Sequence, residues 1–469
     1  MDLANDGNLS IAYLAPRIRK RKLSPVELTR FVLDRIDRLQ PRLNAFITVT
    51  PQIALRQATE AEDEIASGVY RGPLHGIPFC LKDLYYTRDV RTTAGSKILR
   101  RFKPRANAWV VDRLFEAGIV LVGKTNLHEF AFGATNNNPH FGPVRNPWLN
   151  DRISGGSSGG SAAAVVAGLA VASLGTDTGG SVRIPAAACG CVGFKPTFGR
   201  IPMDGIVPLA TSLDHAGAIC RSVTDAATVL GVITGVGSSE PSRRPTPYKA
   251  FTRDLNRGIK ELRVGVPRQY FFDRLQPEVR RLTLAAIGEL EGLGAVVREV
   301  RLKLMSETAR LAAEITVAEA LAYHWEWLHQ RPEDYGPDLR SRMEASRDMT
   351  AVTYIRARQR CEEYRREFAH SMREVDLIAA PTLPVTAPPI DDGFVQTGGE
   401  PEDVRLALLR LTRPGNLTGF PAVSVPCGFT EDGLPVGLQL IGHPTQDALV
   451  LRAAYTYEQN TPWHRNFPE

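Results

Sequence analysis

The sequence predicts an α/β protein built on a mixed β-sheet that is flanked by helices. Two observations predict this class. Amphipathic helical patterns alternate with short apolar runs through the first half of the chain, and two more apolar runs separated by a turn lie near its end. The 469 residues are 43% hydrophobic and 23% charged, enough to bury a large core. We expect one domain over residues 1–469.

The first predicted helix has a clear start. Ser24 and Glu27 form a capping box, and Pro25 occupies the first helical position. Apolar residues then recur at helical spacing as far as Leu39. The pattern therefore predicts an amphipathic helix with one face packed against the core.

Short apolar runs predict the strands. The run GIPFCLKDL over 76–84 is typical of a buried strand. A helix over 109–117 and a strand over 118–123 continue the alternation. The runs 422–426 and 437–441, on either side of an Asp-Gly turn, predict two strands that return to the sheet.

The centre of the chain is rich in glycine and serine. The stretch SGGSSGGS over 154–161 alone resembles a flexible linker, but it leads directly into the small, apolar run SAAAVVAGLAVASLG over 161–175, which predicts a fully buried helix. A loop that opens such a helix presents unpaired N–H groups, to an anion or to a catalytic serine. The lysine of a P-loop and the acidic residue of a dinucleotide fingerprint are both missing, which favours the serine.

The stretch TDTGGSVRIP over 176–185 supplies such a serine. Ser181 follows two glycines at a bend, where backbone N–H groups can stabilise an oxyanion. None of the nine histidines lies in these glycine-rich motifs, so an imidazole base is not indicated. Another group must take the proton of Ser181.

Composition excludes several other classes. The net charge is +6, but Lys and Arg are spread along the chain, and the dense run RIRKRK over 17–22 reads as a solvated face rather than a nucleic-acid patch. Six cysteines without a paired framework predict reduced thiols in a cytoplasmic protein, and Cys189 and Cys191 lack zinc-ligand spacing. No secretory or membrane-spanning segment is indicated. We expect no metal, no cofactor, no nucleic acid and no membrane partner.

Several separate motifs together resemble the amidase signature family. They are, in chain order, GIPFCLKDL, GKTNLHEFAFG, the long glycine-rich pattern over 155–197, SLDHAG, and NLTGFPAVSVPCGF. The resemblance covers most of the chain and is specific, because the motifs occur in the family's order. It implies a twisted mixed sheet with helices on both faces, and a Ser-cisSer-Lys catalytic triad.

The triad residues follow from this resemblance one at a time. Ser181 matches the nucleophile, Ser157 the bridging serine on a cis peptide, and Lys82 the base. A lysine with an ordinary pKa of about 10.4 is a poor base at neutral pH, but burial among apolar neighbours lowers that pKa. Neutral Lys82 could then accept a proton from Ser157, which accepts one from Ser181. The backbone N–H groups around Thr178, Gly179 and Gly180 are expected to hold the oxyanion.

Other residues near these motifs have expected supporting roles. Asp177 and Arg183 flank the nucleophile, and we expect them to pair and fix the loop. Ser158 could hydrogen-bond in the site or exchange roles with Ser157. Phe130 and Phe132 are either core residues or part of the lining of an apolar substrate cleft.

A divergent helical region over about 240–400 is expected to determine the substrate. A surface linker rich in Pro, Ser and Arg over about 237–260 lies at its start. Tyr323, Trp325 and Trp327 form an aromatic group there, for which core packing is favoured over substrate contact. No motif in this region names the substrate.

Three functions fit the motifs. The first, which we favour, is an amidase that acts alone on a small amide through an acyl-enzyme, an activity that extends in parts of the family to esters, anilides or carbamates. The second is the glutaminase component, the A subunit, of a tRNA-dependent amidotransferase. In that component, the amino group of glutamine is held by an acidic residue just before a Pro-x-Asn motif, whereas residues 409–413, before Pro414, contain no acid. The third, a non-catalytic binding protein, is disfavoured because every triad position is filled. A monomer or homodimer is expected.

Overall fold

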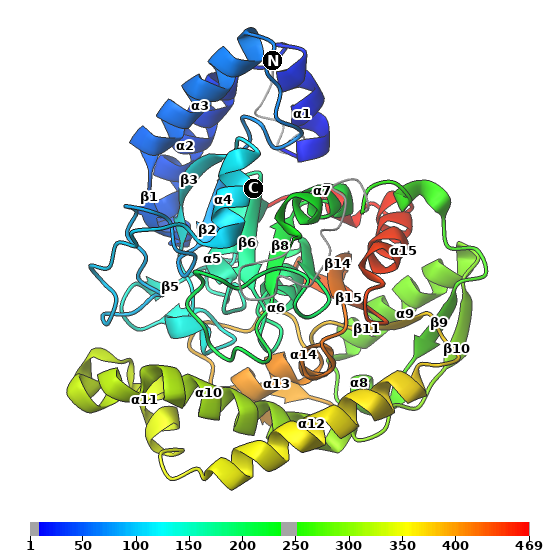
Figure 1. The fold of residues 1–469 in the computed structure, drawn as a ribbon. Coiled ribbons are helices and arrows are strands. Elements are labelled where there is room, and N and C mark those ends of the chain that lie inside the picture. Colours follow the sequence, from blue (N-terminus) through cyan, green and yellow to red (C-terminus); the bar gives the residue numbers. More distant parts are fainter. Residues whose placement is uncertain (1–8, 236–250, 469) are drawn as a thin grey trace.

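The computed structural model describes residues 9–235 and 251–468, and one mixed sheet of eleven strands runs through it. β2 is parallel to both of its neighbours, and so is β9, while the other pairs are antiparallel. The predicted α/β class with a mixed sheet is confirmed (Figure 1). In spatial order the strands are β1 (Phe46–Val49), β3 (Val120–Thr125), β2 (Pro78–Lys82), β6 (Ala172–Thr176), β8 (Ala216–Cys220), β7 (Val192–Lys195), β14 (Ala422–Phe429), β15 (Pro435–Gly442), β11 (Leu377–Pro381), β9 (Arg263–Val266) and β10 (Val296–Glu299).

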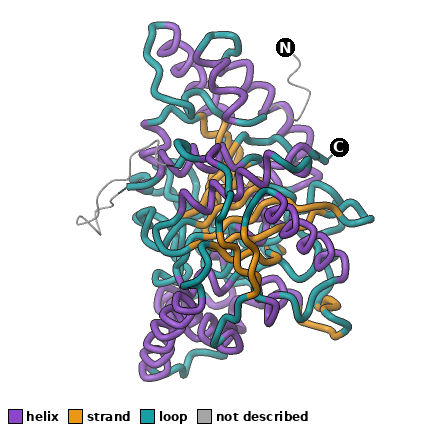
Figure 2. The backbone as a smooth tube through the Cα atoms, turned by 90° about the vertical axis from the view of Figure 1, so that its right-hand side faces the viewer, coloured by secondary structure: helices purple, strands orange, loops and turns teal. Residues whose placement is uncertain are grey.

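Helices cover both faces of this sheet, which passes through the middle of the molecule (Figure 2). Successive side chains of β8 show this, because a strand alternates its side chains between two faces. Ile219 packs with α5 and α6, while Ala218 and Cys220 pack with α7. The first seven helices are α1 (Ile11–Arg19), α2 (Pro25–Leu43), α3 (Pro51–Ala66), α4 (Trp109–Glu116), α5 (Gly159–Val166), α6 (Arg183–Cys189) and α7 (Val223–Ile233).

The second half of the chain adds a helical layer below the sheet in the view of Figure 1, where α10, α11, α12 and α13 lie across its lower edge. Two small two-stranded sheets accompany the large one, β4 (Asn137–Asn138) with β5 (Gly142–Pro143), and β12 (Phe394–Thr397) with β13 (Glu400–Asp403). The remaining helices are α8 (Arg268–Phe271), α9 (Pro277–Gly292), α10 (Thr308–Gln330), α11 (Pro337–Glu344), α12 (Ala351–Ser371), α13 (Val404–Arg410), α14 (Arg413–Thr418) and α15 (Asp447–Gln459).

Several local predictions are confirmed. Ser24 caps α2, since its Oγ accepts hydrogen bonds at 3.1 Å from the N–H groups of Val26 and Glu27. The two strands predicted near the end of the chain are β14 and β15, which pair antiparallel. The six cysteines are all buried free thiols.

Two local predictions are wrong in detail. The run over 161–175 is not one helix, because α5 ends at Val166 and the chain turns at Gly168, which has a φ of +69°, before β6 begins. The region expected to be helical also contributes β9, β10 and β11 to the large sheet and β12 to a small one. Most of the linker expected over 237–260 lies outside the described residues. Among the described helices, none is both long and apolar enough to cross a bilayer.

Candidate active site

Lys82 lies at the end of β2, whose five residues are all buried. Because β2 and β6 are parallel, their carboxyl ends meet at one edge of the sheet. There the Nζ of Lys82 donates hydrogen bonds to Ser157 Oγ at 2.8 Å and to Thr176 Oγ1 at 2.9 Å. The lysine is thus held by two hydroxyl groups and has no carboxylate within ion-pair distance among the described residues.

Burial changes the acid-base behaviour of this amine. Desolvation lowers the pKa of Lys82 to about 7, although the negative charges of Asp177 and Asp214 oppose that shift. A substantial fraction of Lys82 is therefore neutral near pH 7. A neutral amine hydrogen-bonded to a serine hydroxyl is equipped to accept its proton.

Ser157 stands in the loop before α5, and the peptide bond between Gly156 and Ser157 is cis. The next residue, Ser158, points elsewhere. Its Oγ contacts the backbone of Thr176 at 3.3 Å, and its N–H donates to the carbonyl of Ser181 at 3.2 Å. The structure therefore brings the hydroxyl of Ser157, and not that of Ser158, to the lysine.

Ser181 is buried at the start of the turn that leads into α6. Within the described residues, the N–H groups of 178–181 donate to no protein acceptor, whereas those of Val182 and Arg183 donate to the carboxylate of Asp177. Four successive N–H groups are thus free to donate to a ligand. The oxyanion role expected for Thr178, Gly179 and Gly180 stays a prediction. No hydrogen bond joins the hydroxyls of Ser181 and Ser157 in the part of the chain that the structure describes, although the backbone contact through Ser158 holds the two loops together.

Asp177 and Arg183 form a fully buried ion pair beneath this loop, with contacts of 2.9 and 3.0 Å. Burial by itself would raise the pKa of Asp177, but the guanidinium of Arg183 holds that pKa well below its ordinary value. Arg183 also donates to Asn416 and Gln439, and Asn416 donates to Asp177. This network joins the serine loop to α14 and β15.

A pocket of about 280 Å³ opens above Ser181. Its walls are the loops 131–133 and 178–181, the first half of α10, the end of α11, and α13 and α14. Sequence reasoning missed five residues here. Thr176 could have been found, because it begins the TDTGGS motif. The segment 409–413 was considered only for an acid that binds glutamine, and its Leu409 and Arg413, like Arg342 and Arg405, reach the pocket through packing. The five residues are Thr176, which contacts Lys82, and the pocket residues Arg342, Arg405, Leu409 and Arg413.

The two phenylalanines expected near the site differ in position. Phe132 lines the pocket, and Arg342 stacks on its ring at 4.3 Å. Phe130 instead turns into the core with a φ of 47°, and its ring centroid lies 4.3 Å from that of His324. This difference arises because the short helix at 129–131 kinks at Phe130.

The aromatic group on α10 lies outside the pocket. Tyr323 and Trp327 pack edge to face at 5.6 Å, and Trp325 is 43% exposed beside His329. His128 contacts Ser157 only through its backbone N–H, at 3.2 Å, and burial lowers its pKa to about 4. No histidine hydrogen-bonds to the hydroxyls of Ser157 or Ser181 in the described chain.

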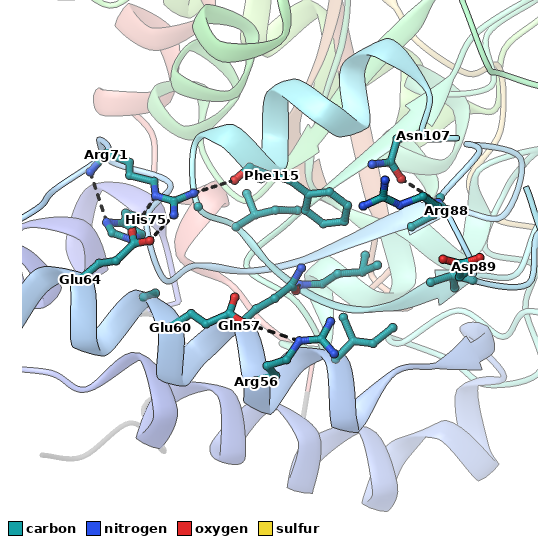
Figure 3. Close-up of a pocket in the computed structure, with 17 residues that line it drawn as sticks. Arg56, Gln57, Glu60, Glu64, Arg71, His75, Arg88, Asp89, Asn107 and Phe115 are labelled. Atoms are coloured by element: carbon teal, nitrogen blue, oxygen red, sulfur yellow. Dashed lines mark hydrogen bonds and ion pairs between the residues drawn. The ribbon is translucent and has the colours of Figure 1, made fainter. Parts of the chain in front are cut away.

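A second pocket of about 500 Å³ lies between α3 and α4, far along the chain from the serine loop (Figure 3). Several of its charged side chains pair with one another, since Glu64 forms an ion pair with Arg71 and its carboxylate also lies 3.1 Å from Nε2 of His75. Among the described residues, no group of three or more His, Cys, Asp or Glu could hold a metal ion.

Comparisons with known proteins agree with this architecture. Residues 27–451 match the family model described as Amidase. The chain is 39% identical to the A subunit of glutamyl-tRNA(Gln) amidotransferase from Geobacter sp. (strain M21), over 97% of this chain and 98% of that protein. It is 40% identical to the corresponding protein of Chloroflexus aggregans, over 96% and 95%.

Solved structures also resemble this chain over nearly its whole length. One, from a vestigial protein complex linked to the evolutionary origins of an s-triazine catabolic enzyme, has a TM-score of 0.91 and 34% identity, over 96% of this chain and 98% of that one. A structure described only as an amidase has a TM-score of 0.87 and 35% identity, over 96% and 99%. The fold and the family match together define a carbon-nitrogen hydrolase. The chain belongs to the amidase signature family.

Proposed function

We propose that this chain is an amidase that hydrolyses a small amide through an acyl-enzyme on Ser181. The observation that carries the proposal is the hydrogen bond of 2.8 Å from a buried lysine to Ser157, beside four unpaired N–H groups at Ser181. Lys82, Ser157 and Ser181 are the proposed catalytic residues, and Thr178, Gly179 and Gly180 supply the oxyanion donors.

The proposed reaction has two halves. Ser181 Oγ attacks the amide carbonyl, its proton passes to Ser157, and the proton of Ser157 passes to neutral Lys82. The proton then returns along the same hydroxyl to the leaving nitrogen, so that the C–N bond breaks and an ester on Ser181 remains. Water attacks this ester by the same route, which releases the acid and restores the three groups.

A second candidate is the glutaminase component of a tRNA-dependent amidotransferase. The names of the relatives from Geobacter and Chloroflexus support this candidate more directly than they support an amidase that acts alone. The pocket supports the first candidate. Its described lining contains three arginines and no Asp or Glu, so it offers no carboxylate to the α-ammonium of glutamine.

A hydrolysis screen of the purified chain distinguishes these candidates. Small primary amides, anilides, esters, carbamates and glutamine are tested with the chain alone and in excess chelator. Turnover of a small amide at a rate above that of glutamine supports the first candidate. Glutamine as the only substrate, or activity that appears only after a partner protein is added, would replace it with the second.

A further inference from the structure

Three arginine side chains line the pocket that contains Ser181. Arg342 lies on α11, Arg405 on α13 and Arg413 at the start of α14. The described lining includes no acidic residue to balance them. Asp338, which lies outside the lining, neutralises Arg342, so the charges without an ion-pair partner among the described residues are those of Arg405 and Arg413.

Among the described residues, one of the three arginines has hydrogen-bond and ion-pair partners. Arg342 donates to the carboxylate of Asp338 and to the carbonyl of Phe132, both at 2.6 Å. Neither Arg405 nor Arg413 forms an ion pair or a side-chain hydrogen bond with any described residue. Arg413 is nevertheless only 6% exposed. Two guanidinium groups, with five N–H donors each, therefore lie at the pocket wall without a protein acceptor among the described residues, Arg413 buried and Arg405 partly exposed.

Arg413 is close to the proposed nucleophile. The preceding residue, Thr412, donates from Oγ1 to the carbonyl of Gly179 at 2.6 Å, which fixes the start of α14 against the serine loop. A Cβ added at Gly179 would lie 3.8 Å from Cγ of Arg413. The arginine stem thus packs directly on the loop that carries the oxyanion donors.

Burying the unpaired charge of Arg413 costs free energy, and a bound anion would lower that cost. Burial, and then the charge of Arg405, lower the pKa of Arg413 to about 10. In the pocket of Figure 3, by contrast, the charge of Arg71 is neutralised within the protein by Glu64. A buried cation without a partner is costly, and an anion that enters the pocket would supply the missing charge and accept the free N–H groups.

We propose that Arg405 and Arg413 bind a carboxylate on the acyl part of the substrate, so that this protein acts on small amides that carry a carboxylate and no neighbouring ammonium. This inference rests on the proposed amidase function. It also separates the substrate from glutamine, whose α-ammonium would enter a pocket of three arginines.

Matched substrates test the proposal with the unaltered protein. Malonamate, succinamate and glutaramate are each compared with the neutral amide in which a methyl group replaces the carboxylate: propanamide, butanamide and pentanamide. Glutamine serves as glutaramate with an added ammonium. We expect kcat/KM for the best carboxylate to exceed that of its neutral partner by about 10- to 100-fold, and glutaramate to exceed glutamine. Equal or faster turnover of the neutral amides throughout the series would overturn the proposal.

Variants connect the preference to the two arginines. Arg405→Met and Arg413→Met are each expected to lower the ratio of carboxylate to neutral kcat/KM by about tenfold or more. Arg347→Met removes the same charge from an exposed position just beyond the pocket, and should leave the ratio unchanged. An unchanged ratio in both pocket variants, with circular dichroism matching that of the parent, would contradict the assignment.

A binding measurement separates this inference from the proposed function. Calorimetric titration of Ser181→Ala protein with succinamate and glutaramate should show binding that Arg413→Met weakens by about tenfold or more. Carboxylate binding without turnover of any amide would end the proposed function and leave the anion site standing. Turnover of neutral amides without any carboxylate binding would support the proposed function and end the proposal of an anion site.

Discussion

Lys82 Nζ lies 2.8 Å from Ser157 Oγ, with the lysine fully buried. Burial lowers the pKa of this amine to about 7, so its basic form grows as pH rises through neutrality. We predict that kcat/KM for a neutral amide increases about tenfold per pH unit below pH 7 and levels off above it. A pH profile measured with the purified chain checks this. A rate that is flat from pH 5 to 8 would mean that a different group takes the proton.

The identity of the base can be tested by substitution. Lys82→Arg places a guanidinium, which stays protonated, where a neutral amine is required. We predict a loss of turnover of about 10⁴-fold or more, with unfolding by urea checked in parallel. Lys124→Arg is the matched control, because Lys124 is also buried but pairs with Asp83 at 3.1 Å, away from the serines. Near-native turnover in Lys82→Arg would mean that another group takes the proton, and His128 would be the next candidate to test.

Ser181 is the proposed site of acylation. A fluorophosphonate that reacts with activated serines should add one label to the parent chain and none to Ser181→Ala. Intact-mass spectrometry counts the labels. Ser173→Ala, which alters a buried serine of β6 that donates to the carbonyl of Cys80, should label as the parent does. Equal labelling of the parent and Ser181→Ala would exclude Ser181 as the nucleophile.

Gly180 permits a backbone geometry that other residues rarely adopt. Its φ is +133°, and an added Cβ would lie 2.1 Å from Oγ1 of Thr412. We therefore predict that Gly180→Ala displaces the oxyanion donors and lowers kcat by about 100-fold or more. Gly288→Ala on α9 is the control, since nothing lies within 4 Å of its added Cβ, and it should leave kcat unchanged. Parental kcat in Gly180→Ala would show that the loop tolerates the methyl group.

The ion pair of Asp177 and Arg183 is predicted to support the fold as well as the loop. Arg183→Leu leaves a buried carboxylate without its partner, which costs about 3–5 kcal/mol in the free energy of unfolding. The more exposed pair of Arg263 with Asp376 provides the comparison, and Arg263→Leu should lower the free energy of unfolding far less than Arg183→Leu does. Urea unfolding of the two variants measures both values. Equal losses would show that burial does not distinguish these pairs.

The sequence alone determined the features that depend on neighbours along the chain. The cap at Ser24, the buried strand that ends at Lys82, and the glycine-rich bend before Ser181 all follow from local hydrogen-bonding and hydrophobic patterns. The motif order was also enough to indicate the family and the three proposed catalytic residues. These features could be predicted because a short stretch of residues specifies each of them.

Only the tertiary structure decided which distant residues form the pocket. Arg342, Arg405 and Arg413 belong to no motif, and they meet Ser181 because α11, α13 and α14 pack over the serine loop. The same packing turned Phe130 into the core and left Phe132 at the pocket wall. A linear pattern records the spacing of side chains within an element. The charge of this pocket depends on how separate elements pack, and that packing is set by the whole core.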